Sequence, residues 1–377
     1  MKKLLLLPLV FLLAGCWDTH QSERMYYILG LGLDYEDDQY TIYAQIIDFS
    51  NIAKSEQPNP EATQVEIGKV TGLTLDDAFF NLYQSMDERL FLGHLGYVIF
   101  SENLAKANKI PVIVNSFIRY RELRYTTWAY VTETPIEDVM LTTPIINKSI
   151  TLSKLSDPLN SYNQSSRVRP IPFRELMIQL DEPSHEAKIP FVEVSEEWST
   201  DKGLDKVHTF VGVSVIDKQN GLKGKLLEKD ALGIQWLTTK TQRSNVTIPF
   251  TNYEEPYVTI TVDQVKPEIK AIVSENPLQF DIEVKLLVQP DEFRNEQQAK
   301  KMKQAIEKQV QKEIEETFLT AVKQDIDIYR LSEVVYRKHH KVWKKYEQDG
   351  KIPLDENSLR NVQVELVKVK GERITSN

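Results

Sequence analysis

The chain has 377 residues, a formal net charge of -9 and a single cysteine. An acidic chain of this kind is a poor candidate for nucleic-acid binding, and one cysteine excludes an internal disulfide. The length is sufficient for two or three domains that each bury a core of their own.

The N-terminal residues have the order of a bacterial lipoprotein signal. A basic start precedes an apolar run at 4–13, and two small residues then precede Cys16. The run is shorter than the roughly 20 residues of a membrane-spanning helix and fits the apolar region of a secretory signal. The segment resembles the lipobox, in which the cysteine is diacylated and the signal is cut before it. We expect a signal peptide at 1–15, lipidation (palmitate) at Cys16 and a tether at 16–24. An ordinary signal with an incidental cysteine is the alternative.

Residues 25–141 predict a first α+β domain. Two β-rich runs, 26–34 and 40–48, flank an acidic turn and indicate a hairpin. Thr74 predicts the start of a helix, with Asp77 as its capping partner. Its inward positions are expected to be Leu75, Phe79, Leu82, Tyr83, Met86 and Leu90. Further strands are expected at 65–70, 97–100 and 125–131, and further helices at 104–123 and 135–141.

The composition changes at residue 142, where Ser, Thr, Asn and Pro become frequent. A helix at 173–180 and a strand at 189–194 are expected in this middle segment. The polar stretch 196–206 contains Gly203 and indicates a boundary. We therefore predict a middle segment or small second domain at 142–206 and a C-terminal α+β domain at 207–377.

The C-terminal part predicts strands in a row, followed by helices. Strands are expected at 209–217, 246–250, 257–265, 268–273 and 278–288, long amphipathic helices at 295–322 and 332–348, and a closing strand at 362–366. This order favours an α+β fold with several domains, mixed and antiparallel sheets flanked by helices, and a C-terminal sheet packed on two long helices.

The sequence shows no pattern of catalytic or metal-binding residues. The isolated histidines are His20, His94, His185 and His208. His339 and His340 are adjacent on an expected helix and point about 100° apart, which does not suit one ion. The segment 30–32 lacks the third glycine of a phosphate loop, and 212–216 lacks the last glycine of a nucleophile elbow. We predict no catalytic site, no cofactor and no metal.

The expected last helix has an apolar face and a basic face. The apolar face, which includes His339, is expected to pack on the C-terminal sheet. The basic face gathers Arg337, Lys338, Lys341, Lys344 and Lys345. In an acidic chain this cluster is either a solvated helix face or a surface that meets anionic lipid headgroups or an acidic loop of a partner.

Several motifs follow one another in a characteristic order. They are Cys16-Trp17-Asp18, Leu29-Gly30-Leu31-Gly32-Leu33-Asp34, Gly93-His94-Leu95, Phe210-Val211-Gly212-Val213, Gly233-Ile234-Gln235-Trp236-Leu237 and Lys323-Gln324-Asp325-Ile326-Asp327. In this order they resemble the Ger(x)C family of spore germination lipoproteins, the C subunits of nutrient germinant receptors. The triplet Gly32-Leu33-Asp34 departs mildly from the Gly-Ile-Asp expected there.

The resemblance implies a lipoprotein on the outer face of the bacterial cell membrane, which is the inner membrane of the spore. It implies a non-catalytic subunit that acts with two membrane-embedded receptor subunits to trigger germination, and α+β domains of unusual topology. It leaves open whether this subunit contacts the nutrient. The alternative is a lipid-anchored solute-binding protein, a class in which strands and helices usually alternate.

Overall fold

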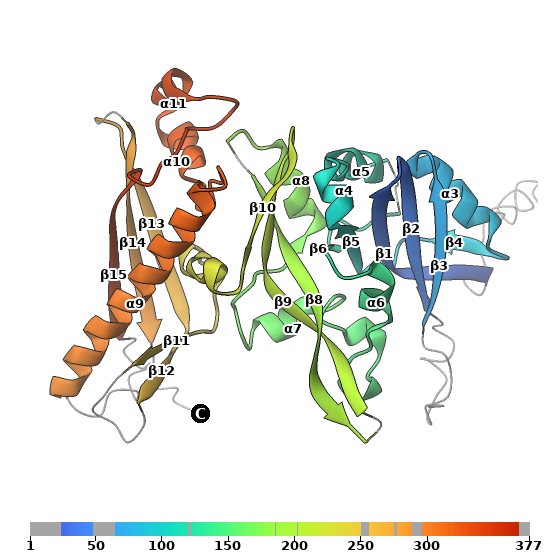
Figure 1. Ribbon diagram of the computed structural model, residues 1–377, viewed down its shortest axis with the longest axis horizontal. Helices are drawn as coiled ribbons and strands as arrows, with labels where there is room; N and C mark the ends of the chain where they lie inside the picture. Colours follow the sequence, from blue (N-terminus) through green and yellow to red (C-terminus); the bar gives the residue numbers. More distant parts are fainter. Residues whose placement is uncertain are drawn as a thin grey trace, which may run out of the picture.

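The computed structural model describes residues 24–47, 65–119, 122–184, 186–201, 203–249, 256–274, 277–288 and 296–368. Within these ranges the chain forms two lobes that lie next to each other along the long axis of the molecule (Figure 1). The first lobe is built on a large mixed sheet, and the second carries smaller sheets beside a long helix. Cys16, the expected signal peptide and most of the expected tether lie outside the described residues.

The sheet of the first lobe has the strand order β10-β9-β8-β6-β5-β1-β2-β3, with β4 paired to β1 and β7 to β6. Its strands are β1 (Met25–Glu36), β2 (Gln39–Ile47), β3 (Val65–Gly72), β4 (Arg89–Phe91), β5 (Tyr97–Ser101), β6 (Trp128–Thr132), β7 (Ile171–Pro172), β8 (Ala187–Thr200), β9 (Gly203–Asp217) and β10 (Gly221–Leu227). The predicted first hairpin is confirmed: β1 and β2 are antiparallel, and Asp37 and Asp38 form its turn with φ of 49° and 59°. Aspartate is one of the few residues other than glycine that tolerates this conformation.

Helices cover both faces of this sheet. They are α3 (Leu75–Gln84), α4 (Glu102–Lys106), α5 (Ile110–Phe117), α6 (Ile136–Leu141), α7 (Pro158–Tyr162) and α8 (Phe173–Asp181), with the short 3-10 turns η2 (Ile145–Asn147) and η3 (Ile150–Leu152). The predicted cap of α3 is confirmed, because Asp77 donates its backbone N–H to Thr74 Oγ1 at 3.1 Å. The helix ends earlier than its apolar spacing indicated, and Leu90 lies in β4 instead.

Gly30 and Gly32 of β1 are positions where neighbouring side chains pack directly against the backbone. A Cβ added to Gly30 would lie 2.3 Å from Tyr97 Cζ, and one added to Gly32 would lie 2.2 Å from Ile136 Cγ2. Tyr97 donates its hydroxyl to Gln45 Oε1 at 2.6 Å, and Gln45 Nε2 donates to the carbonyl of Met140 at 2.6 Å. The segment 30–32 therefore lets α6 and β5 approach a buried strand closely.

The second lobe packs β-strands against the helix α9. Its elements are η4 (Glu228–Leu237), β11 (Ser244–Pro249), β12 (Tyr257–Val262), β13 (Gln264–Ile272), β14 (Gln279–Val288), α9 (Glu296–Val322), α10 (Leu331–Lys338), α11 (His340–Tyr346) and β15 (Leu359–Lys368). The inward stripe of α9, from Met302 to Phe318, is at most 2% exposed, as its spacing predicted. The closing strand rejoins the sheet as expected, because β15 pairs in parallel with β14. None of the described helices combines the length and the apolar composition needed to cross a membrane.

The structure bears out the α+β fold with mixed sheets and a C-terminal sheet-and-helix region. It also differs from the sequence-based predictions at the expected helix 104–123, which is divided into α4 and α5, and at two further places. The polar stretch 196–206 contains a β-hairpin that joins β8 to β9, so the predicted limit at 206/207 falls inside a strand of the first lobe. The expected second long helix is broken at His339, with φ -136° and ψ 51°. The His339 N–H closes α10 on the Val335 carbonyl, and the His339 carbonyl accepts from Trp343 to begin α11.

Candidate functional site

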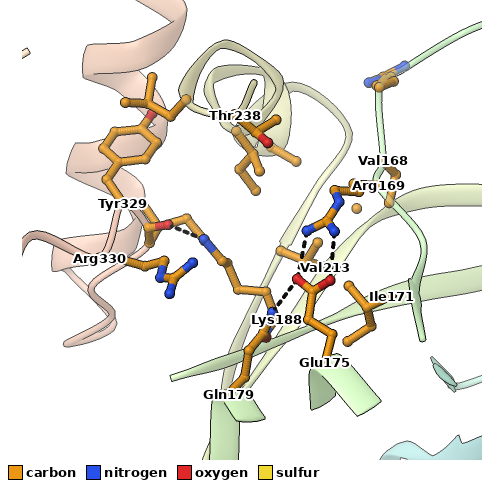
Figure 2. A pocket seen from close by; sticks show the side chains of 16 residues that line it. Val168, Arg169, Ile171, Glu175, Gln179, Lys188, Val213, Thr238, Tyr329 and Arg330 are labelled. Carbon is orange, nitrogen blue, oxygen red and sulfur yellow. Dashed lines mark hydrogen bonds and ion pairs between the residues drawn. The ribbon is translucent and has the colours of Figure 1, made fainter. Parts of the chain in front are cut away.

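A cavity of about 120 Å³ lies where the two lobes meet. It is enclosed by β8, β9, α8 and the segment before β7 from the first lobe, and by η4 and the segment before α10 from the second (Figure 2). By the same measure a single water needs roughly 10–15 Å³, so the cavity can hold a small molecule or ion. Its charged lining side chains are Arg167, Arg169, Lys188, Arg330 and Glu175.

Lys188 reaches across this cavity from β8. Its Nζ donates to the backbone carbonyl of Ile328 in the second lobe at 2.8 Å. Among the described residues the ammonium group has no ion pair with a carboxylate and no other hydrogen bond. Burial of the ammonium group lowers the pKa of Lys188 to about 8, and the nearby positive charge of Arg330 contributes to this shift.

Glu175, the lining carboxylate, is held by other residues. Arg169 donates to both of its oxygens, with Nη1 and Nη2 each at 2.6 Å. Gln179, one turn further along α8, donates its Nε2 to Glu175 Oε1 at 2.9 Å and accepts the backbone N–H of Lys188 at 3.0 Å. This geometry fixes Glu175 on Arg169, so Glu175 forms no ion pair with Lys188.

Arg330 approaches from the second lobe. Its backbone is left-handed, with φ 61° and ψ 38°, and Figure 2 shows its guanidinium group next to the Lys188 side chain. Arg330 Nε lies 2.5 Å from Glu333 Oε2, so the guanidinium group has a carboxylate partner on α10. The carboxylate of Asp327 on the same segment caps α10, because it accepts the backbone N–H groups of Leu331 and Ser332 at 2.8 and 2.7 Å.

A second charged cluster at the same junction is balanced. Glu186 pairs with Lys223 at 2.9 Å and with Lys351 at 3.3 Å, and Asp325 pairs with the same two lysines at 2.6 and 2.7 Å. Although burial opposes it, the hydrogen bond that Lys223 donates to Asp325 and the negative charge of Glu186 raise the pKa of Lys223 above its usual range. Two carboxylates thus offset two lysines here, and the cluster holds the lobes together.

The predicted basic cluster lies on α10 and α11, and the structure changes the role of one member. Arg337 ion-pairs with Glu182 of the first lobe at 2.6 Å and with Glu333 at 2.7 Å, so it belongs to the lobe junction. The other members, Lys338, Lys341, Lys344 and Lys345, are exposed. The break at His339 turns Trp343 toward the first lobe, where its Nε1 donates to Ser184 Oγ at 2.5 Å.

Sequence reasoning missed the cavity residues. Arg169, Lys188 and Arg330 stand far apart in the chain, and each looks ordinary in its own segment. The available signal was a lysine inside an apolar strand, since Lys188 lies between Ala187 and Ile189. Within the described ranges, no group of three or more His, Cys, Asp and Glu side chains is placed to hold a metal ion.

Comparisons with known proteins give a consistent result over most of the chain. Residues 18–194 match the family model described as "Spore germination protein N-terminal domain", and residues 211–370 match "Spore germination B3/ GerAC like, C-terminal". Spore germination protein KC of Bacillus subtilis (strain 168) is 23% identical over 366 residues, which cover 90% of this chain and 88% of that protein. Spore germination protein B3 of the same organism is 23% identical over 278 residues, or 72% of this chain and 70% of that protein.

The fold also resembles a solved structure. The crystal structure of the GerBC protein superposes with a TM-score of 0.56 at 16% sequence identity, over 90% of this chain and 97% of that chain. At this identity the likeness concerns the fold alone.

Proposed function

The chain belongs to the GerAC-like family of spore germination proteins, and from this membership we propose that it is a non-catalytic component of a germinant receptor that triggers spore germination. The observation that carries the proposal is the match of two family models, one after the other, to residues 18–194 and 211–370. Both halves of the family's architecture are therefore present in one chain, in the family's order.

The proposal includes attachment to the membrane by lipid at Cys16, with the folded lobes on the outer face of the cell membrane. The order of basic start, apolar run, small residues and cysteine supports it. One acyl chain binds a membrane only marginally, whereas two chains hold a protein stably. A diacylated Cys16 would thus keep the lobes next to membrane-embedded subunits.

The proposal also includes two membrane-embedded partner subunits. The resemblance to receptor C subunits supports this, as do similarities to three spore germination proteins of Bacillus subtilis (strain 168), KC, B3 and A3. In this arrangement the two lobes present binding surfaces to the partners, and no chemical step is assigned to the chain.

The alternative of a solute-binding protein has less support from the fold. Lobes of that class usually alternate strands and helices around parallel sheets. In the second lobe the strands from β11 to β14 follow one another with no described helix between them, and the pairs β11–β12 and β13–β14 are antiparallel. The architecture therefore favours the receptor component.

Deletion of the gene in its spore-forming host tests the proposal. Spores that lack the chain should lose germination in response to at least one nutrient mixture, measured by the fall in optical density and the release of dipicolinic acid. Expression of the wild-type chain from another locus should restore the response. Unchanged germination of the deletion spores with every nutrient mixture that acts on wild-type spores would contradict the proposal.

A further inference from the structure

The cavity between the lobes has an excess of positive charge. Lys188 and Arg330 both line it and lie next to each other, and the lining carboxylate Glu175 pairs with Arg169. The neighbouring carboxylates on the second lobe are also engaged, since Asp327 caps α10 and Glu333 pairs with both Arg330 and Arg337. A buried charge without a partner is costly, and like charges at close range increase that cost.

The neighbouring cluster of Glu186, Asp325, Lys223 and Lys351 has equal numbers of positive and negative charges, and the cavity differs from it. At the same junction, Lys223 and Lys351 each contact two carboxylates. Lys188 instead has the Ile328 carbonyl as its one acceptor among the described residues, while Arg330 pairs with Glu333. The ammonium group of Lys188 therefore keeps N–H donors that can bind an anion, and the cavity around it is many times larger than one water.

We propose that this cavity binds a small oxyanion, a carboxylate or phosphate group, with Lys188 and Arg330 as its principal ligands. Arg167, an exposed residue of the lining, would raise the positive potential at the site. Carboxylate and phosphate share the chemistry that these side chains recognise, namely oxygen acceptors with negative charge. The volume of about 120 Å³ limits the ligand to a small ion or the charged group of a small molecule.

Such an anion would bridge the two lobes. Lys188 belongs to β8 of the first lobe, and Arg330 directly precedes α10 of the second. The anion would replace repulsion between their charges by attraction of both to one ligand, so binding would tighten the contact between the lobes. This inference is independent of the proposed function and can be tested on the isolated protein.

The test uses the full chain, purified in detergent at pH 7. Thermal unfolding is measured while inorganic phosphate or acetate is added, with sodium chloride as the control at equal ionic strength. A saturating oxyanion should raise the Tm by about 4 °C beyond the chloride control, as expected for a ligand near 100 times its Kd. A response to phosphate alone identifies phosphate chemistry, and a response to acetate alone identifies a carboxylate. No rise with either probe would overturn the proposal.

Variants locate the effect. Lys188→Met keeps most of the length of the side chain but removes the charge, and it should abolish the rise in Tm. Lys266→Met, on the exposed face of β13, is the matched control and should respond like the wild type. Arg167→Gln changes an exposed side chain, so it should fold normally and weaken the apparent Kd several-fold in calorimetry. A wild-type response in Lys188→Met, or an unchanged Kd in Arg167→Gln, would place the anion elsewhere and refute the assignment.

Discussion

Lys223 on β10 and Asp325 after α9 lie 102 residues apart in sequence and form an ion pair of 2.6 Å between the lobes. Glu186 completes the cluster from the first lobe with a side chain that is only 5% exposed, whereas that of Asp325 is 68% exposed. The two carboxylates therefore contact the same lysines in different surroundings. Mutating each carboxylate separately therefore distinguishes how much the buried ion pairs of Glu186 and the exposed ion pairs of Asp325 contribute to stability.

Glu186→Gln should lower the free energy of unfolding by about 3 kcal/mol, because it leaves Lys223 and Lys351 without their buried partner. Asp325→Asn is the matched control and should cost about 1 kcal/mol or less, since exposed pairs contribute little. Asparagine also tolerates the left-handed backbone at this position, where φ is 56°. Urea denaturation of the two variants measures both costs, and equal costs would contradict the assignment of the buried role to Glu186.

The stability of the protein should rise with pH between about 8 and 10.5, because the pKa of Lys188 falls from its usual 10.5 to about 8 on folding. In this window the unfolded chain binds the proton and the folded chain does not, so deprotonation favours folding by up to about 3 kcal/mol. The groups that face Lys188 are Arg330, Asp327, Glu333 and Arg169.

The measurement is the free energy of unfolding against pH for the wild type and for Lys188→Met. The variant should lack this rise, and the difference between the two curves isolates Lys188 from tyrosines that titrate higher. Parallel curves would mean that the Lys188 ammonium group is not buried in the folded state.

Gly32→Ala should destabilise the first lobe by about 2 kcal/mol, because the new methyl group would lie 2.2 Å from Ile136 Cγ2 and force α6 away from β1. Gly68→Ala on β3 is the control. There the nearest atom to an added Cβ is Leu82 Cδ1 at 3.5 Å, an ordinary contact, so stability should be unchanged or slightly higher. Thermal unfolding of both variants measures the difference in stability. Similar Tm values for the two would show that α6 moves to accommodate the methyl group without a loss of stability.

Cys16→Ala should prevent lipidation and leave the protein uncut or released from the membrane. Membranes from cells that produce the variant are fractionated and washed with salt, and the chain is detected by immunoblot. The control is Lys266→Met, which should stay in the membrane fraction. A mature-length Cys16→Ala chain that remained in the washed membranes would exclude Cys16 as the anchor.

The exposed lysines of α10 and α11 can be tested apart from Arg337. Lys338→Glu, Lys341→Glu and Lys344→Glu together should leave the stability within about 0.5 kcal/mol, because these side chains are exposed. Arg337→Glu should cost about 1 kcal/mol, because it places like charges beside Glu182 and Glu333. If the lysines orient the protein on anionic lipid or on a partner, the triple variant should lose co-purification with the membrane subunits. Normal co-purification and germination of the triple variant would show that these lysines only contact solvent.

Sequence patterns predicted those helices and strands whose signals lie within the element itself. The stripe of α9 repeats at helical spacing, and Thr74 caps α3 through its own side chain, so each was visible in the sequence. The β8–β9 hairpin was missed because its far end is largely exposed and lacks the apolar alternation of a half-buried strand. The break at His339 carries no proline or glycine signal, and it accompanies the contact of Trp343 with Ser184.

The cavity was beyond local patterns for the same reason. Its ligating groups come from segments that meet only after both lobes have folded, as with Lys188 and Ile328, which are 140 residues apart. The unfavourable free energy of burying Lys188 depends on residues from both lobes, so it cannot be recognised from the sequence of β8.

Strand β8 connects the cavity between the lobes to an exposed hairpin. It runs from Lys188 at the cavity to the far end of the hairpin, where Trp198 is 51% exposed, and it is paired to β9 over most of that length. Ten residues of strand extend about 33 Å, so a tilt of about 5° at the cavity would displace Trp198 by about 3 Å. Because one end of the hairpin lies between the lobes, a change in the relative position of the lobes would be larger at its exposed end than at the cavity.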